Sequence, residues 1–230
     1  MTIAENIARI RANMAAAARE AGRDPKEILL VGASKMNDAA ACREAVAAGI
    51  DALGENRVQE MVQKLEQHAY DGAPLHFIGH LQRNKVKQVV GHVALIQSVG
   101  SLELLDEIEK VAAARGLVQD ILLEVNISRE AAKSGFAPEK VLPAAEAALE
   151  RTHVRVRGLM TIPPADAQRD ANFRYFQEVQ ALYVDMNQKL FHNELEYLSM
   201  GMSGDYEDAI RAGATMVRVG SAIFGARHYN

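Results

Sequence analysis

Several features that support particular classes of protein are scarce or absent in this sequence. Its 230 residues include one cysteine, Cys42, so no disulfide can form within the chain. Tryptophan is absent, and no stretch approaches the roughly 20 consecutive apolar residues of a membrane-spanning helix. The sequence therefore predicts a globular protein held together by its hydrophobic core. Cys42 lies in an alanine-rich helical stretch, where we expect it to be a packed side chain.

An excess of positive charge is also lacking. The formal net charge is −4, which gives no general attraction to nucleic acids or to anionic membranes. Arg9 and Arg11 interrupt the N-terminal segment where a signal peptide would need an apolar core, so we expect a cytoplasmic protein. Residues 1–22 instead predict an amphipathic helix that packs on the rest of the molecule. Its apolar positions recur at helical spacing: Ile3, Ile7, Ile10 and Met14.

Short apolar runs alternate with longer amphipathic stretches along the rest of the chain. The eight apolar runs, rich in Val, Ile and Leu, are typical of parallel strands covered by helices: residues 28–35, 52–56, 75–80, 94–100, 120–127, 154–162, 197–202 and 216–225. The helical patterns between them are 38–48, 57–67, 84–90, 102–115, 138–149, 170–190 and 206–212.

This alternation predicts an α/β fold in which residues 1–230 form a single (β/α)₈ TIM-like barrel; a doubly wound open sheet is the alternative. Gly49 and Gly116 stand where glycines that end helices are expected, and Asp205 stands at an N-cap position. After the last apolar run only residues 225–230 remain, so we expect the eighth helix to be vestigial. The N-terminal helix would then cover the gap.

In a (β/α)₈ barrel the functional face is formed by the C-terminal ends of the strands. The residues at these ends are mostly polar, although the strand bodies are apolar. They are Lys35, Asn56, His80, Ser98, Asn126, Thr161, Ser203, Gly220 and Ser221. A purely structural role does not require so many polar strand ends, so this face is the predicted site.

Lys35 ends the very apolar strand LLVGASK, with Val31 and Ala33 on the same face. A lysine that points into a barrel mouth is partly desolvated, which favours the neutral amine and makes it a candidate nucleophile for a carbonyl group. Strand position alone equally allows a lysine whose ammonium extends into solvent.

A phosphate site is predicted at the last two strands, where barrels usually bind phosphate. The seventh strand leads into Ser203 and Gly204 just before a helix, and the eighth leads into Gly220 and Ser221. Backbone N–H groups and two hydroxyls at these turns suit a phosphate dianion. The alternative is that the glycines only allow tight turns.

Arg218 is predicted to point into the barrel. It alternates with Val217 and Val219 on the last strand, so the valines face the helices and Arg218 faces inward. An interior guanidinium needs an acceptor, either a carboxylate such as Glu124 or an atom of a ligand.

Two further groups are weaker candidates. His76 and His80 are four residues apart on a strand, which is too far to share a metal ion, so we predict no metal site. Lys133 follows the fifth strand at the same barrel face, either as a second lysine that reacts with aldehydes or as an ordinary loop lysine.

Five segments, LLVGASK, GENRVQE, HFIGHLQRNK, SMGMSGDYEDAI and RVGSAIFG, resemble the pyridoxal-phosphate homeostasis protein family, in the order found there. That family's barrel is similar to the N-terminal domain of alanine racemase, a fold-type III enzyme of pyridoxal 5′-phosphate (PLP). The resemblance implies that Lys35 carries PLP as a Schiff base. It also implies that Ser203, Gly220 and Ser221 hold the phosphate, that Asn56 lines the pocket, and that Arg218 faces the pyridine nitrogen. Met202 and His80 would pack on the ring.

The resemblance implies a PLP-binding protein of intracellular vitamin B6 homeostasis and no catalytic residue. Racemases of this type carry a second domain that supplies a catalytic tyrosine, and we expect none here because the sequence ends nine residues after Ser221. A cation facing the pyridine nitrogen also weakens the ring as an electron sink. The expected partners are PLP itself and, transiently, PLP-dependent apo-enzymes, with the chain as a monomer or weak dimer. A PLP-dependent amino-acid racemase and a class I aldolase remain the alternatives.

Overall fold

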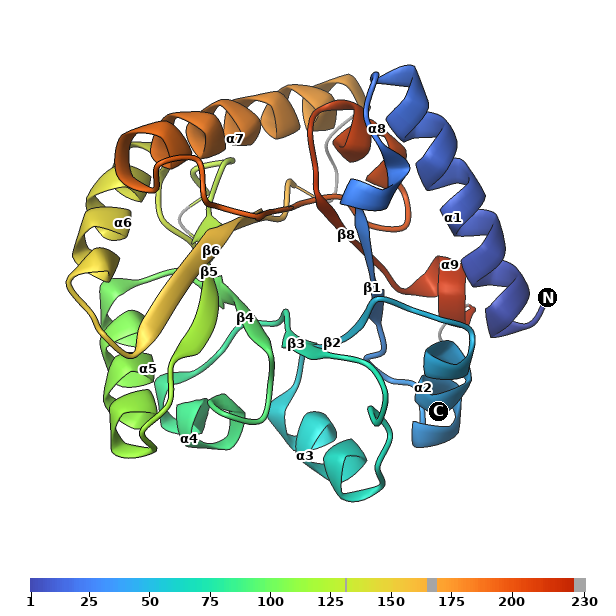
Figure 1. Ribbon diagram of the computed structural model, residues 1–230, viewed down its shortest axis with the longest axis horizontal. Helices are drawn as coiled ribbons and strands as arrows, with labels where there is room; N and C mark the ends of the chain where they lie inside the picture. The colour runs from blue at the N-terminus through green and yellow to red at the C-terminus, as the bar shows by residue number, and fades with distance from the viewer. Residues whose placement is uncertain (131, 165–168, 226–230) are drawn as a thin grey trace.

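The computed structural model describes residues 1–130, 132–164 and 169–225. Eight parallel strands close into one barrel in the order β1-β2-β3-β4-β5-β6-β7-β8, with helices around it (Figure 1). The strands are β1 Leu29–Ala33, β2 Ala52–Glu55, β3 Leu75–Phe77, β4 Leu95–Val99, β5 Gln119–Val125, β6 Val154–Thr161, β7 Tyr197–Ser199 and β8 Met216–Val219. The predicted closed barrel is therefore confirmed, and the open sheet is excluded.

The outer layer consists of helices that follow the strands. They are α1 Ile3–Glu20, α2 Ala39–Ala47, α3 Val58–Glu66, α4 Val86–Val89, α5 Leu102–Ala114, α6 Val141–Leu149, α7 Arg169–Leu190, α8 Tyr206–Arg211 and α9 Ser221–Phe224, with short 3₁₀ turns at Pro25–Glu27, Arg83–Lys85 and Pro138–Lys140. Each predicted helical segment matches one of these helices to within a few residues, because amphipathic periodicity marks them in the sequence.

Two apolar layers hold the barrel together. The larger lies between the strands and the helices and includes Cys42, which is fully buried as predicted. The smaller fills the base of the barrel interior with one side chain from each of six strands: Val31, Ala52, Leu95, Leu122, Met160 and Met216. Since side chains alternate along a strand, the residues further along each strand on this inner face point toward the mouth.

The N-terminal helix α1 begins at a Thr2–Glu5 capping box and packs against α8, α9 and α2 (Figure 1). It buries Ile7, Ile10 and Met14, and the Asn6 side chain donates a hydrogen bond to the Ile223 carbonyl at 2.9 Å. The predicted role of this helix in covering the last part of the barrel is confirmed.

One local prediction was wrong, and another was correct for the position of the residue although its side chain makes other contacts. The last apolar run is not a strand to residue 225: β8 ends at Val219, and Ser221–Phe224 form the helical turn α9. Asp205 occupies the N-cap position of α8, but its side chain makes no capping hydrogen bond. Its carboxylate instead accepts from the Met202 N–H at 2.6 Å and from the Asn172 amide at 3.2 Å. Gly49 and Gly116 do follow their helices with positive φ, as predicted.

Strand β6 contains an irregularity at the point where it meets β7. The register with β5 shifts between Ile121 and Leu122, so that Leu122 pairs with Gly158. Gly158 has φ +151, and a Cβ atom there would lie 1.7 Å from the Tyr197 carbonyl oxygen. Only glycine allows β7 to approach this closely.

No helix in the described part of the chain is both long enough and apolar enough to cross a bilayer.

Candidate functional site

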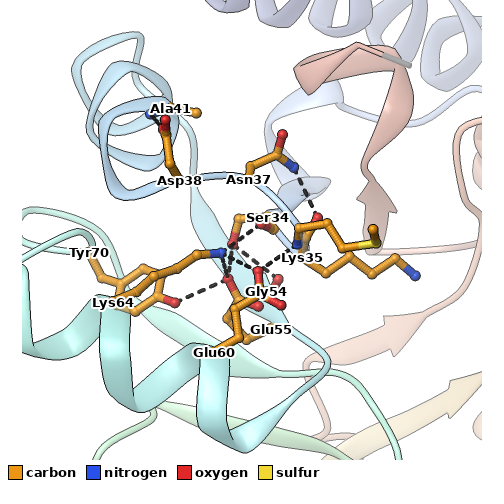
Figure 2. A network of polar contacts seen from close by, with 11 residues as sticks. Ser34, Lys35, Asn37, Asp38, Ala41, Gly54, Glu55, Glu60, Lys64 and Tyr70 are labelled. Atoms are coloured by element: carbon orange, nitrogen blue, oxygen red, sulfur yellow. Dashed lines mark hydrogen bonds and ion pairs between the residues drawn. The ribbon is translucent and has the colours of Figure 1, made fainter. Parts of the chain in front are cut away.

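Lys35 lies at the C-terminal mouth of the barrel, in the turn that follows β1. The strand itself ends two residues earlier at Ala33, and the inward position of Val31 places Ala33 and then Lys35 on the face that leads to the mouth. Figure 2 shows the Lys35 side chain extending away from the polar cluster behind it. The turn continues through Met36, which has φ +63, an uncommon conformation for a residue with a side chain.

The structure brings Ser203 together with the turn that follows β8. Its hydroxyl oxygen accepts hydrogen bonds from the backbone N–H groups of Gly220 at 3.2 Å and Ala222 at 3.4 Å. Ser221 is exposed beside them. The pairing of Gly32 with Val219 places Gly220 next to Ala33, where a Cβ atom would lie 3.2 Å from the Ala33 carbonyl. The predicted phosphate turn therefore lies beside the strand that leads to Lys35.

Arg218 points into the barrel, as the strand pattern predicted, and is 3% exposed. Its guanidinium donates to the Ser199 hydroxyl at 2.6 Å and to the Thr161 carbonyl at 2.8 Å. The suggested acceptor Glu124 makes no ion pair with it among the contacts of the described residues. Burial lowers the pKa of Arg218 to about 10, and Asp205 and Glu124 favour its charge, so it remains cationic at neutral pH.

A chain of hydrogen bonds continues from Arg218 across the barrel interior. The Ser199 hydroxyl donates to the Gln97 side-chain oxygen at 2.6 Å, and the Gln97 amide nitrogen lies 3.0 Å from Nδ1 of His76. Burial lowers the pKa of His76 to about 4, so its ring is neutral at physiological pH. Sequence patterns did not single out Ser199 or Gln97, whose inward position on the strands was the only available signal.

The remaining predicted residues lie at the same mouth. Asn56 follows β2, and its side-chain oxygen is buried without a hydrogen-bond partner in the described structure. Met202 is 36% exposed in the loop after β7. His80 is exposed, whereas His76 is buried. No cluster of three potential metal ligands occurs among the residues that the structure describes.

Two cavities, of about 680 and 550 Å³, open over the β3–β6 side of the mouth and share His80, Lys133 and Ser134 as lining residues. Lys133 pairs with Glu130 at 2.8 Å there. Glu124 lines the smaller cavity with one carboxylate oxygen unpartnered, and burial raises its pKa. Lys35, Ser203 and Gly220 belong instead to the β1, β7 and β8 side of the mouth.

Comparison with known sequences shows extensive similarity. Residues 6–228 match the family described as alanine racemase, N-terminal domain. The pyridoxal phosphate homeostasis protein of Pseudomonas aeruginosa is 43% identical over 228 residues, covering 99% of this chain and 97% of that protein. The protein of the same name from Aquifex aeolicus is 41% identical over 229 residues, with full coverage of both.

Solved structures give a consistent result. PipY of Synechococcus elongatus with PLP bound superposes with a TM-score of 0.85 at 31% identity, covering 97% of this chain and 100% of PipY. An alanine racemase of Clostridium difficile shares the barrel with a TM-score of 0.68 at 18% identity, but this chain spans only 53% of that protein. The second similarity concerns the fold alone.

Proposed function

The chain belongs to the pyridoxal phosphate homeostasis protein family, and we propose from this that it binds PLP on Lys35 as a Schiff base and acts in PLP homeostasis. The observation that supports this most strongly is the arrangement at the mouth. Lys35 follows β1, the turn with Ser203, Gly220 and Ser221 lies beside the end of that strand, and β8, the strand paired with β1, carries the buried cation Arg218.

The residues at the mouth fit the chemistry of PLP. When bound, PLP supplies an aldehyde that reacts with an amine, a phosphate dianion, and a pyridine ring. Lys35 supplies the amine. The hydroxyls of Ser203 and Ser221 supply donors for a phosphate, and the Gly220 N–H, which here donates to the Ser203 oxygen, lies in the same turn. The unpartnered oxygen of Asn56 is available to a hydrogen-bond donor. Met202, half exposed beside them, suits contact with the face of a ring.

Arg218 affects which reactions a bound PLP could support. Its guanidinium is held by Ser199 and Thr161 and keeps its charge, so it would oppose protonation of a pyridine nitrogen placed against it. An unprotonated ring is a weak electron sink, which disfavours transamination. Racemisation, the alternative function, needs an acid/base on each face of the substrate Cα, and Lys35 would supply only one of them. Incubating the loaded protein with L-amino acids in D₂O tests this, since a racemase would exchange the Cα proton and a carrier would not.

The decisive experiment replaces Lys35, the residue proposed to bind PLP covalently. We expect Lys35→Ala to fold normally, with a change in stability within about 0.5 kcal/mol, because the side chain lies at the mouth and contributes little packing. It should lose the adduct that borohydride fixes on the wild type in the presence of PLP, as read by mass spectrometry of the peptides. Lys133→Ala is the matched control, since that lysine lies at the same barrel face and should keep the Lys35 adduct. An adduct that persists in Lys35→Ala would assign the anchor elsewhere.

The proposed function also involves other proteins that use PLP. A cytoplasmic protein would exchange PLP with apo-enzymes through transient contacts, as a monomer or weak dimer. Transfer of PLP from the loaded protein to a PLP-dependent apo-enzyme, compared with free PLP at the same concentration, measures whether such an exchange occurs.

A further inference from the structure

A buried cluster of charged and polar side chains lies directly behind the turn that carries Lys35 (Figure 2). Its centre is Lys64 of α3, with a side chain 6% exposed, and Glu55 at the end of β2, with a side chain fully buried. The Glu55 Oε1 atom accepts from the Lys64 ammonium at 2.7 Å, the Ser34 hydroxyl at 2.7 Å and the Tyr70 hydroxyl at 3.1 Å.

Lys64 is not a second reactive amine, although it is close to Lys35 in the fold. Its ammonium donates to the Ser34 carbonyl at 2.8 Å, to Glu55 at 2.7 Å and to Glu60 at 2.7 Å, which uses all three of its hydrogens. Burial lowers the pKa of Lys64, but the charge of Glu55 and the hydrogen bonds to both glutamates outweigh it and leave that pKa above its usual value. Lys64 therefore remains charged and acts through its contacts.

Those contacts hold the backbone on both sides of Lys35. On one side, the Ser34 carbonyl accepts from Lys64, and the Ser34 N–H donates to the Gly54 carbonyl at 3.0 Å. On the other side, the Met36 N–H donates to Glu60 Oε1 at 2.5 Å. Lys35 is thus the residue between two peptide groups that are both tied to the cluster.

The cluster contains or adjoins two features that are unfavourable for the stability of the fold. Met36 has φ +63, a strained conformation that persists only where surrounding contacts enforce it. A buried ion pair such as Lys64–Glu55 is seldom a better stabiliser than apolar side chains of similar size. The strained Met36 and the buried ion pair are both explained if the cluster holds the backbone around Lys35 in one geometry. A shift of about 1 Å at a reacting group can lower its reactivity roughly a hundredfold.

We propose that Glu60 and Lys64 are positioning residues: together they fix the peptide groups before and after Lys35, so that its amine stays directed into the barrel mouth. This inference rests on the proposed function of Lys35. It assigns no chemistry to the cluster itself.

Glu60→Ala is the informative variant because it releases the Met36 N–H while Glu55 still pairs with Lys64. Two probes separate positioning from binding. Pyridoxal has the aldehyde and reports capture by Lys35 after borohydride reduction, whereas pyridoxine 5′-phosphate is an alcohol and reports binding without reaction. We expect roughly a tenfold loss of pyridoxal capture, the effect of one hydrogen bond to a charged acceptor, and unchanged affinity for pyridoxine 5′-phosphate.

Two further variants serve as controls. Glu66→Ala changes an exposed glutamate of the same helix that makes no contact with the cluster, and should behave as wild type. Glu60→Gln keeps an oxygen that can accept from the Met36 N–H, and should restore most of the capture. Amide hydrogen exchange of Met36 in the ligand-free protein gives an independent reading: we expect protection in wild type and Glu60→Gln, and faster exchange in Glu60→Ala.

The outcomes separate this inference from the proposed function. If wild type captures pyridoxal on Lys35 and Glu60→Ala captures it equally well, the positioning role of Glu60 is wrong, but Lys35 is still the reactive lysine. An unprotected Met36 amide in wild type also overturns the role, even if Glu60→Ala does not fold. If wild type forms no adduct on Lys35, the proposed function itself fails.

Discussion

Ser203 and Ser221 have different surroundings, although both are assigned to the phosphate. The Ser203 oxygen already accepts from the Gly220 and Ala222 N–H groups, so this hydroxyl also orders the start of α9. A hydroxyl has one hydrogen to donate in addition to its acceptor positions, and that hydrogen remains for a ligand. Ser221 is exposed at the first position of α9. The two side chains therefore offer separate donors to one anion.

Removing either hydroxyl should weaken PLP binding without preventing reaction at Lys35. A hydrogen bond to a charged acceptor contributes about 1.5–3 kcal/mol, so Ser203→Ala and Ser221→Ala should each raise the dissociation constant of PLP roughly ten- to a hundredfold. Pyridoxal, which has no phosphate, should bind the wild type and both variants almost equally. Competition between PLP and pyridoxal measures this. Equal weakening of the two ligands would show that the phosphate lies elsewhere.

Strand alternation made Lys35 and Arg218 predictable, because one apolar strand fixes which side chains face inward. The partners of these residues were not predictable. Arg218 is held by Ser199 and Thr161 of two other strands, and their alignment depends on the register of the closed barrel. Lys64 was not singled out in the sequence, and only the packing of α3 against β2 reveals its contact with Glu55.

Strand β6 illustrates how one residue sets the spacing of two elements. A Cβ atom at Gly158 would lie 1.7 Å from the Tyr197 carbonyl, so Gly158→Ala must push β7 away from β6 at the bulge. We expect a loss of about 4 kcal/mol or more in the free energy of unfolding, measured by urea denaturation, or failure to fold. Gly204→Ala is the matched control, since a Cβ atom there meets nothing within 4 Å. Similar unfolding midpoints for the two variants would contradict the assigned bulge.

Elements with strong periodicity were predicted closely, whereas the four-residue helix α9 was not predicted. The pattern at 102–115 corresponds to α5 Leu102–Ala114, because Ser101 caps its start and Gly116 follows its end. The helix α9 has only four residues, which is too few to show a helical period. Its apolar residues were therefore predicted as a continuation of the preceding strand. Asp205 was correctly predicted at the N-cap of α8, but its contact with Asn172 was not predictable because Asn172 comes from a different helix.

The acid stability of the whole molecule depends on the ring of His76 inside the barrel. Burial lowers its pKa in the folded state to about 4, against 6.5 for an exposed histidine. Between these values the unfolded chain binds more protons than the folded one, so the contribution of His76 to stability decreases as the pH falls. We expect a loss on the order of 3 kcal/mol between about pH 6.5 and 4.

Unfolding by urea as a function of pH tests this in His76→Gln. The variant should show a flatter dependence than wild type across the same range, whatever its stability at neutral pH. His92→Gln, a change at an exposed histidine, should keep the wild-type slope. A His76→Gln profile parallel to wild type would mean that the ring accepts a proton without cost inside the barrel.

The contact of α1 with α8 and α9 has a consequence during synthesis of the protein. Asn6 and its partner Ile223 are 217 residues apart, so the helix leaves the ribosome long before the segment that covers it exists. At 5–20 residues per second, this interval lasts about 10–40 s. During that time Ile7, Ile10 and Met14 form an uncovered apolar stripe on the nascent chain. Substitutions that weaken α1 docking should therefore lower the yield of soluble protein in cells before they alter the finished barrel.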